Sequence, residues 1–158
     1  MSTDPREIVE AGYNVAADDY AHWVAGNVDP GRAKYLDLFC DRLPAGARVM
    51  DLGCGGGGRT TERLASRFAL TGIDLSATQI ERSRARLPSA TFVQADMTRF
   101  EVAPGSFDGV AAFYSLIHLP YGELPSMMVR LAGWLAEGAY SLPRLARATQ
   151  VSTSSRRG

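Results

Sequence analysis

Residues 49–58 read V-M-D-L-G-C-G-G-G-G, a short apolar run with an acidic residue that leads into a loop made almost entirely of glycine. A loop between the carboxyl end of a strand and the start of a helix is where α/β sheets bind their ligands. Glycine permits the tight turn and lets the backbone come close to a ligand. This stretch therefore predicts an α/β fold with a ligand-binding loop after its first strand.

The glycines of this loop fit two ligand-binding patterns at once. Gly53, Gly55 and Gly58 match G-x-G-x-x-G, the fingerprint of dinucleotide-binding loops. Asp51 with glycine at 53, 55 and 57 matches D-x-G-x-G-x-G instead. The nucleoside triphosphate pattern G-x-x-x-x-G-K-S/T is absent. The loop by itself therefore leaves a dinucleotide and a methyl donor as alternatives.

The chain around the loop alternates between apolar runs of strand length and amphipathic runs of helical length, which predicts a parallel sheet with helices on both faces. A helix from Asp4-Pro5 and a second from Asp29-Pro30 to Pro44 are expected before the first strand. The pattern predicts strands at 48–52, 68–74, 91–95 and 107–113, and helices at 58–66, 76–87 and 121–136.

Acidic residues close the first three predicted strands, at one edge of the expected sheet. Asp51 is unfavourable beside a pyrophosphate but suits a ligand with a cationic amine. Asp74, 21 residues after Gly53, can accept hydrogen bonds from ribose hydroxyls. Asp96 can accept from an adenine amino group while Met97 packs against the base. A helix cap or turn is the alternative role for Asp74 and for Asp96, but the three acids together favour a methyl donor over a dinucleotide.

The order and spacing of four segments are similar to those of class I S-adenosylmethionine-dependent methyltransferases of the small, Rossmann-like kind. The segments are V-M-D-L-G-C-G-G-G at 49–57, T-G-I-D-L-S at 71–76, F-V-Q-A-D-M at 92–97 and F-D-G-V-A-A-F-Y-S-L-I-H-L at 107–119. The resemblance implies a Rossmann-like three-layer sandwich with strand order 3-2-1-4. It also implies an N-terminal helical cap over 1–46 and a donor-binding core over 47–137.

The resemblance further implies that S-adenosylmethionine is the cofactor. Asp51 and the Gly53 backbone would face its amino acid end, beside the backbone near Phe113. Asp74 would hold the ribose. A tyrosine of the N-terminal helices, Tyr20 in preference to Tyr13, would reach the donor or else belong to the core. The full set of implied donor contacts is Tyr20, Asp51, Gly53, Cys54, Gly55, Gly57, Asp74, Leu75, Gln79, Asp96, Met97 and Phe113.

His118, which follows the fourth predicted strand, is the candidate general base for an acceptor that must lose a proton. The alternative is a histidine that closes this loop or packs under the next helix. Cys54 is either a nucleophile or, as we favour, a small filler beside the backbone. Neither Cys40 nor Cys54 has metal-ligand spacing, so no metal site is expected.

The acceptor is expected to be a small molecule. The formal net charge is zero, and no basic patch with interleaved aromatic residues suggests nucleic acid. No apolar run is long enough to span a bilayer and the N-terminus lacks the features of a secretory signal, so a cytoplasmic protein is expected. A binding protein without transferase activity and, less favoured, a nicotinamide-dependent oxidoreductase are the alternatives.

The pattern changes after Glu137, beyond which no acidic residue occurs. Residues 138–158 carry four arginines and many small polar residues, which predicts an irregular or disordered tail. Residues 139–142 leave room for a short fifth strand at most. We interpret the chain as a truncated or frame-shifted methyltransferase. The competing hypothesis is a half-sheet protein that forms a homodimer through the exposed edge of strand 107–113.

Overall fold

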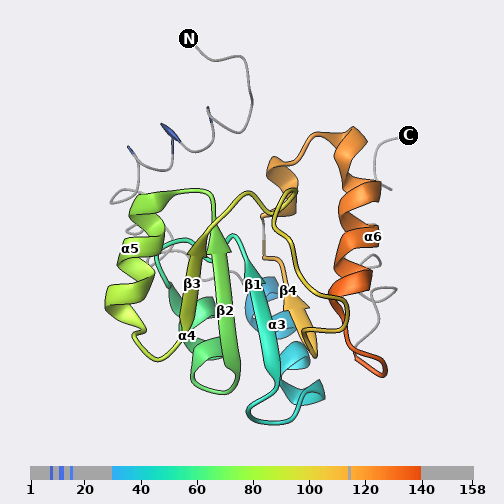
Figure 1. Ribbon diagram of the computed structural model, residues 1–158. Helices are drawn as coiled ribbons and strands as arrows, with labels where there is room; N and C mark the ends of the chain where they lie inside the picture. The colour runs from blue at the N-terminus through green and yellow to red at the C-terminus, as the bar shows by residue number, and fades with distance from the viewer. Residues whose placement is uncertain (1–7, 9–10, 13–14, 16–29, 114, 140–158) are drawn as a thin grey trace, which may run out of the picture.

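The computed structural model describes residues 8, 11, 12, 15, 30–113 and 115–139, and these form a layered α/β structure (Figure 1). Four parallel strands make one sheet in the order β3-β2-β1-β4. The predicted three-layer Rossmann-like architecture and its strand order are thus confirmed. The strands are β1 (Arg48–Leu52), β2 (Ala69–Asp74), β3 (Thr91–Gln94) and β4 (Gly109–Ala111).

Local sequence signals mark the starts of two of the described helices. Pro30 opens the first turn of α3, where the N–H that proline lacks needs no partner. Ser76 caps α5 by accepting a hydrogen bond from the backbone N–H of Gln79. The described helices are α3 (Pro30–Arg42), α4 (Arg59–Ala65), α5 (Ala77–Arg86) and α6 (Leu124–Trp134), with short 3-10 turns η1 (Leu116–His118) and η2 (Tyr121–Glu123).

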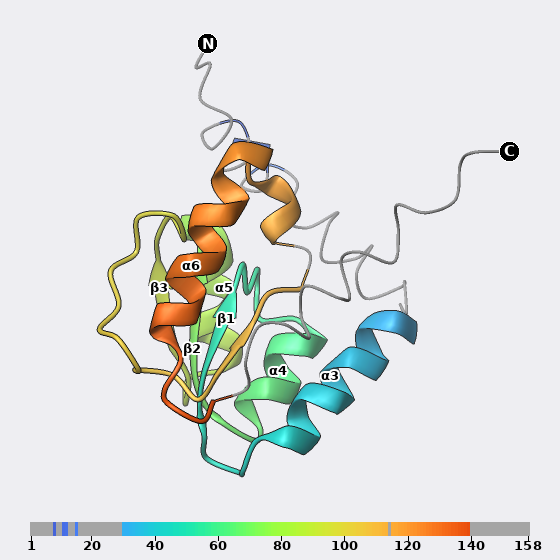
Figure 2. The ribbon, with the colours of Figure 1, turned by 90° about the vertical axis from the view of Figure 1, so that its right-hand side faces the viewer.

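Helices cover both faces of the sheet, with α3 and α4 on one side and α6 on the other (Figure 2). Successive β1 residues serve the two faces, because Val49 packs with α3 and α4 whereas Met50 and Leu52 pack with α6. All residues of β1 after Arg48 are buried, as expected for a central parallel strand covered on both sides. The α5 helix packs on β2 and β3 through Ile80.

The predicted fourth strand, 107–113, is longer than the observed β4. Its ladder with β1 spans only the three pairs from Val49↔Gly109 to Asp51↔Ala111, because β1 itself turns away at Gly53, which has a positive φ of 69°. At the other end, Phe107 forms a parallel bridge with Leu135 and accepts a hydrogen bond from Ala136 N–H at 2.8 Å.

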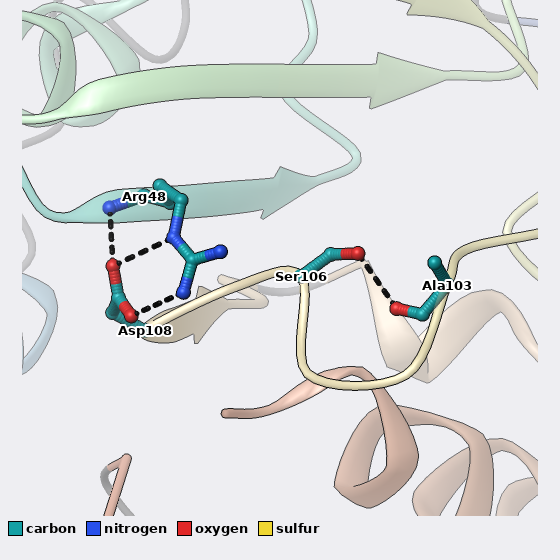
Figure 3. Close-up of polar contacts among 4 residues, drawn as sticks. All are labelled: Arg48, Ala103, Ser106 and Asp108. Carbon is teal, nitrogen blue, oxygen red and sulfur yellow. Dashed lines mark hydrogen bonds and ion pairs between the residues drawn. The ribbon is translucent and has the colours of Figure 1, made fainter. Parts of the chain in front are cut away.

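An ion pair fixes the entry to β4 (Figure 3). One carboxylate oxygen of Asp108 accepts from the backbone N–H and Nε of Arg48, and the other accepts from its Nη2 at 2.8 Å. This pairing lowers the pKa of Asp108. In the preceding turn, Ser106 Oγ donates to Ala103 O at 2.7 Å. The contacts join the start of β1 to that of β4, at the opposite end of the strands from the glycine loop.

Two other expectations are revised or lie outside the described residues. The single helix predicted over 121–136 is instead η2 followed by α6, and the chain at Leu135 is already extended to pair with Phe107. Ala139 lies in a bend rather than a strand, and the rest of the expected fifth strand and tail lies outside the described residues. No helix among the described residues is long and apolar enough to cross a membrane.

Candidate functional site

The predicted acids of β1 and β2 meet at the carboxyl edge of the sheet, around the glycine loop. Asp74 accepts hydrogen bonds from Gly55 N–H at one oxygen and from Ser76 N–H at the other, both at 2.9 Å. It therefore ties the glycine loop to the turn before α5. A carboxylate has about four lone-pair sites, so these two bonds leave acceptor capacity for a ligand.

The glycines of the loop differ in what surrounds them. A Cβ at Gly53 would lie 2.5 Å from Ser115 Cβ, one at Gly56 would lie 2.8 Å from Gln79 Oε1, and one at Gly57 would lie 3.2 Å from Ser83 Cα. Packing against other elements thus accounts for these three glycines. A Cβ at Gly55 would have no described atom within 4 Å, and this residue has a positive φ of 55°. A Cβ at Gly58 would likewise meet none, so the open positions of the loop, among the described residues, are Gly55 and Gly58.

Side chains of α4 and α5 hold the carbonyl groups of the loop. Ser83 Oγ donates to Gly55 O at 2.6 Å, and Thr61 Oγ1 lies 3.1 Å from Cys54 O and 2.8 Å from Asp51 Oδ2. Because a hydroxyl has a single proton, Thr61 donates to only one of its two partners at a time. These contacts hold the loop from the side of α4 and α5, and no described atom occupies the space beside Gly55.

Burial dominates the electrostatics of the two acids. Asp51 is 3% exposed, and burial raises its pKa to about 7. The Thr61 hydrogen bond and the charge of Arg32 oppose this rise, whereas the charge of Asp74 adds to it. Burial also raises the pKa of Asp74, against the hydrogen bonds from Ser76 and Gly55. The buried Asp51 and the partly buried Asp74 beside the loop suit a cationic group and disfavour a pyrophosphate.

Cys54 belongs to the core rather than to the open side of the loop. Its side chain is 5% exposed and clusters with Ile80 and Phe92. Burial is the largest cause that raises the pKa of this thiol, and the negative charges of Asp51 and Asp74 raise it further. A thiol held protonated is a poor nucleophile, so the structure supports the filler role.

Asp96 caps the turn after β3. Its Oδ1 accepts from Thr98 N–H at 2.8 Å and from Thr98 Oγ1 at 2.7 Å, and Oδ2 lies 3.7 Å from Arg99 Nε. The alternative role that the sequence left open is therefore present, and contact with an adenine stays a prediction. Met97 is partly buried against the cluster that α6 covers.

The remaining candidates lie at different depths around this edge. His118 is exposed in η1, and its charge is among the influences that lower the pKa of Asp74, which places it near the loop. Phe113 is partly buried against the α3 and α4 core. Leu75 is partly buried directly after Asp74, and Gln79 is buried behind Gly56. Tyr20 lies outside the described residues.

Within the described part of the chain no group of three or more potential ligands could hold a metal ion.

A family model described as a methyltransferase domain matches residues 49–138, from β1 to beyond α6. This chain belongs to the methyltransferase-domain family. Trans-aconitate 2-methyltransferase of Paracidovorax citrulli is 42% identical to this methyltransferase domain over 100 residues, which are 61% of this chain and 37% of that protein. Magnesium-protoporphyrin O-methyltransferase of Rhodobacter capsulatus is 35% identical over 124 residues, 73% of this chain and 54% of that protein.

A solved structure is also similar to this methyltransferase domain. The amino pentose methyltransferase of Micromonospora echinaspora, determined with bound S-adenosylmethionine, has a TM-score of 0.64 at 26% identity. The similarity covers 75% of this chain and 52% of that one. The chain therefore spans between a little over a third and about half of the length of these three proteins.

Sequence reasoning missed three residues that shape the site of this methyltransferase domain. Thr61 and Ser83 hold the loop from α4 and α5, and Arg32 of α3 acts on Asp51 through its charge. A hydroxyl residue on the buried side of a helix next to a glycine loop is a signal that could have pointed to Thr61. Ser83 and Arg32 depend on how the helices pack, which no short pattern reveals.

Proposed function

We propose that this chain binds S-adenosylmethionine at the carboxyl edge of the sheet and transfers its methyl group to a small molecule. The observation that carries the proposal is the empty space beside Gly55, where a Cβ would meet no described atom within 4 Å, in a loop that follows the buried Asp51 and is held by the partly buried Asp74. Family membership supports it, because the relatives at 42% and 35% identity are named as methyltransferases. Their named substrates, trans-aconitate and magnesium-protoporphyrin, are both small molecules, but they differ too much to name an acceptor for this chain.

The residues present fit this donor. The ammonium group of its amino acid end would meet Asp51, the buried acid nearest to the start of the loop. Asp74 keeps acceptor capacity for ribose hydroxyls while it holds Gly55. The adenine would lie toward Leu75 and the turn at Asp96 and Met97. The bound donor supplies a methyl group that is already activated on a sulfonium and whose leaving group departs neutral.

The task of the protein is then mainly to align the acceptor and to exclude water. The hydrogen bonds from Thr61 and Ser83 keep the loop rigid for this purpose. Where the acceptor must lose a proton, His118 is the candidate base, because it is exposed in η1, which follows β4 at the carboxyl edge of the sheet. We also propose a cytoplasmic location, which the two free buried cysteines, Cys40 and Cys54, support.

Calorimetric titration of the full chain with S-adenosylhomocysteine, with NAD as the control ligand, tests the proposal. We expect S-adenosylhomocysteine to bind and NAD not to bind. Asp74→Ala should weaken the binding of S-adenosylhomocysteine by roughly 1–3 kcal/mol, because it removes a hydrogen-bond acceptor from a partly buried site. A folded protein that binds NAD but not S-adenosylhomocysteine would refute the proposal.

A further inference from the structure

Thr61 of α4 lies between two acceptors that belong to different parts of the site. Its Oγ1 is 2.8 Å from Asp51 Oδ2, in the central strand, and 3.1 Å from Cys54 O, in the glycine loop. Thr61 and Asp51 are each 3% exposed, so both are shielded from water. The hydroxyl has one proton and can donate it to only one of the two oxygens at a time.

The protonation state of Asp51 decides which oxygen receives this proton. An ionised carboxylate only accepts hydrogen bonds, so Thr61 then donates to Asp51. A protonated carboxyl group can itself donate to Thr61 Oγ1, and the hydroxyl of Thr61 is then free to donate to Cys54 O. Cys54 O also accepts a longer bond, 3.4 Å, from Gly57 N–H, so it keeps a partner in both states. Both arrangements therefore satisfy the buried polar groups.

The surroundings of Asp51 favour its protonated state when no ligand is present. Burial is the main cause that raises its pKa to about 7, and the negative charge of Asp74 adds to the rise. The hydrogen bond from α4 and the positive charge of Arg32 oppose it. Burial keeps the nearby Cys54 thiol neutral by raising its pKa, and the positions paired with Asp51 in β2 and β4 are glycine and alanine. An added positive charge near Asp51 would therefore favour its ionisation at neutral pH.

We propose that Thr61 is a positioning residue that couples the protonation of Asp51 to donor binding. The inference rests on the proposed function, in which the ammonium group of the donor lies toward Asp51. In the ligand-free site below neutral pH, Asp51 keeps its proton and Thr61 donates to Cys54 O. When the donor binds, this proton leaves to solvent and Thr61 turns to donate to the ionised Asp51. The coupling acts through charge, which is weakly screened in a buried site, so the ammonium group needs to lie near Asp51 but need not contact it.

The pH dependence of S-adenosylhomocysteine binding tests this coupling. The affinity of the wild-type protein should rise between pH 6 and pH 9, because ionised Asp51 attracts the ammonium group. Thr61→Val removes the hydroxyl that favours the ionised state, so it should shift this rise to higher pH by about one unit. Its affinity should therefore be about tenfold below that of wild type at pH 6 and nearly equal to it at pH 9. Thr61→Ser, which keeps the hydroxyl, should behave like wild type.

Two controls and a second measurement assign the effect to this pair. Thr60→Val makes the same change one residue earlier on α4, where the threonine side chain makes no hydrogen bond within the described part of the chain, and its affinity should match wild type at every pH. 5′-Methylthioadenosine lacks the ammonium group, so Thr61→Val and wild type should bind it equally at pH 6. Calorimetry in buffers of different ionisation enthalpy should show that wild type releases more protons on binding S-adenosylhomocysteine at pH 6 than Asp51→Asn does.

The outcomes separate the inference from the proposed function. A loss of affinity in Thr61→Val that is the same at pH 6 and pH 9, an equal loss for 5′-methylthioadenosine, or equal proton release by Asp51→Asn and wild type would each overturn the inference. If Thr61→Val does not fold, the comparison of proton release still decides it. Failure of the wild-type protein to bind S-adenosylhomocysteine at any of these pH values would instead overturn the proposed function.

Discussion

Replacing Asp51 by asparagine is expected to remove much of the pH dependence of folding in the ligand-free protein. Asp51 is 3% exposed at the end of the central strand, and burial raises its pKa from 3.8 to about 7. Thr61 and Arg32 stabilise the ionised carboxylate, but they do not offset its desolvation. Asparagine has the same shape and cannot ionise, so Asp51→Asn removes the titration and keeps an oxygen for Thr61.

The sign and size of the effect follow from linkage. A carboxyl group whose pKa is higher in the folded than in the unfolded state stabilises the fold at low pH, and this contribution is lost as pH rises. The loss begins near pH 4, where the unfolded chain ionises, and is complete just above pH 7. The difference between the two pKa values of Asp51 corresponds to about 4 kcal/mol. More than half of it, roughly 2–3 kcal/mol, falls between pH 5 and pH 8.

Urea unfolding followed by circular dichroism at pH 5 and pH 8 measures the effect. The free energy of unfolding of wild-type protein should fall between these pH values by roughly 2–3 kcal/mol more than that of Asp51→Asn. Comparing the two proteins cancels most of the contribution of Asp74, which both contain. Asp41→Asn, which removes an exposed carboxylate of α3, is the control and should behave like wild type. Equal pH dependence in Asp51→Asn and wild type would refute the reasoning.

Three further predictions concern the loop and the sheet edge. Gly55→Ala should lower the free energy of unfolding by only the roughly 1–2 kcal/mol that a side chain costs at positive φ. Gly53→Ala should lower it by a further ~1–3 kcal/mol, because its Cβ would meet Ser115. Equal urea midpoints for the two variants would contradict this. Thr61→Val should lower the free energy of unfolding by roughly 1–3 kcal/mol, because Asp51 loses its hydrogen bond from Thr61. The loss should be larger at pH 8, where Asp51 is ionised, than at pH 5. An equal loss of stability at both pH values would contradict this. We also propose that the outer edge of β4 pairs with a second copy of the chain, because β1 is its one strand neighbour in the described sheet. Sedimentation velocity should then show a dimer whose fraction rises with protein concentration. A monomer at every concentration would exclude this.

Much of the fold could be predicted because its signals are local. Strand-length apolar runs alternate with amphipathic segments, and this alternation alone implies a parallel sheet covered on both faces. Ser76 and Pro30 mark helix starts through chemistry that involves only their near neighbours in sequence. The limits of β4 could not be predicted this way, because they depend on where β1 turns away and on the pairing of Phe107 with Leu135.

The sequence by itself determined that a glycine loop follows the first strand and that acids close the first three strands. It could not determine which glycine faces a ligand, since that depends on what packs against each one. The parallel pairing of β4 with β1 brings Ser115, 62 residues away in sequence, onto Gly53, and α5 fills the space beside Gly56 and Gly57. Gly55 and Gly58 are left open because no described atom lies within 4 Å of where their Cβ atoms would be. Tertiary packing thus decided which side of the loop is open. The physical reason is that only segments distant in sequence can fill the space where a Cβ would be.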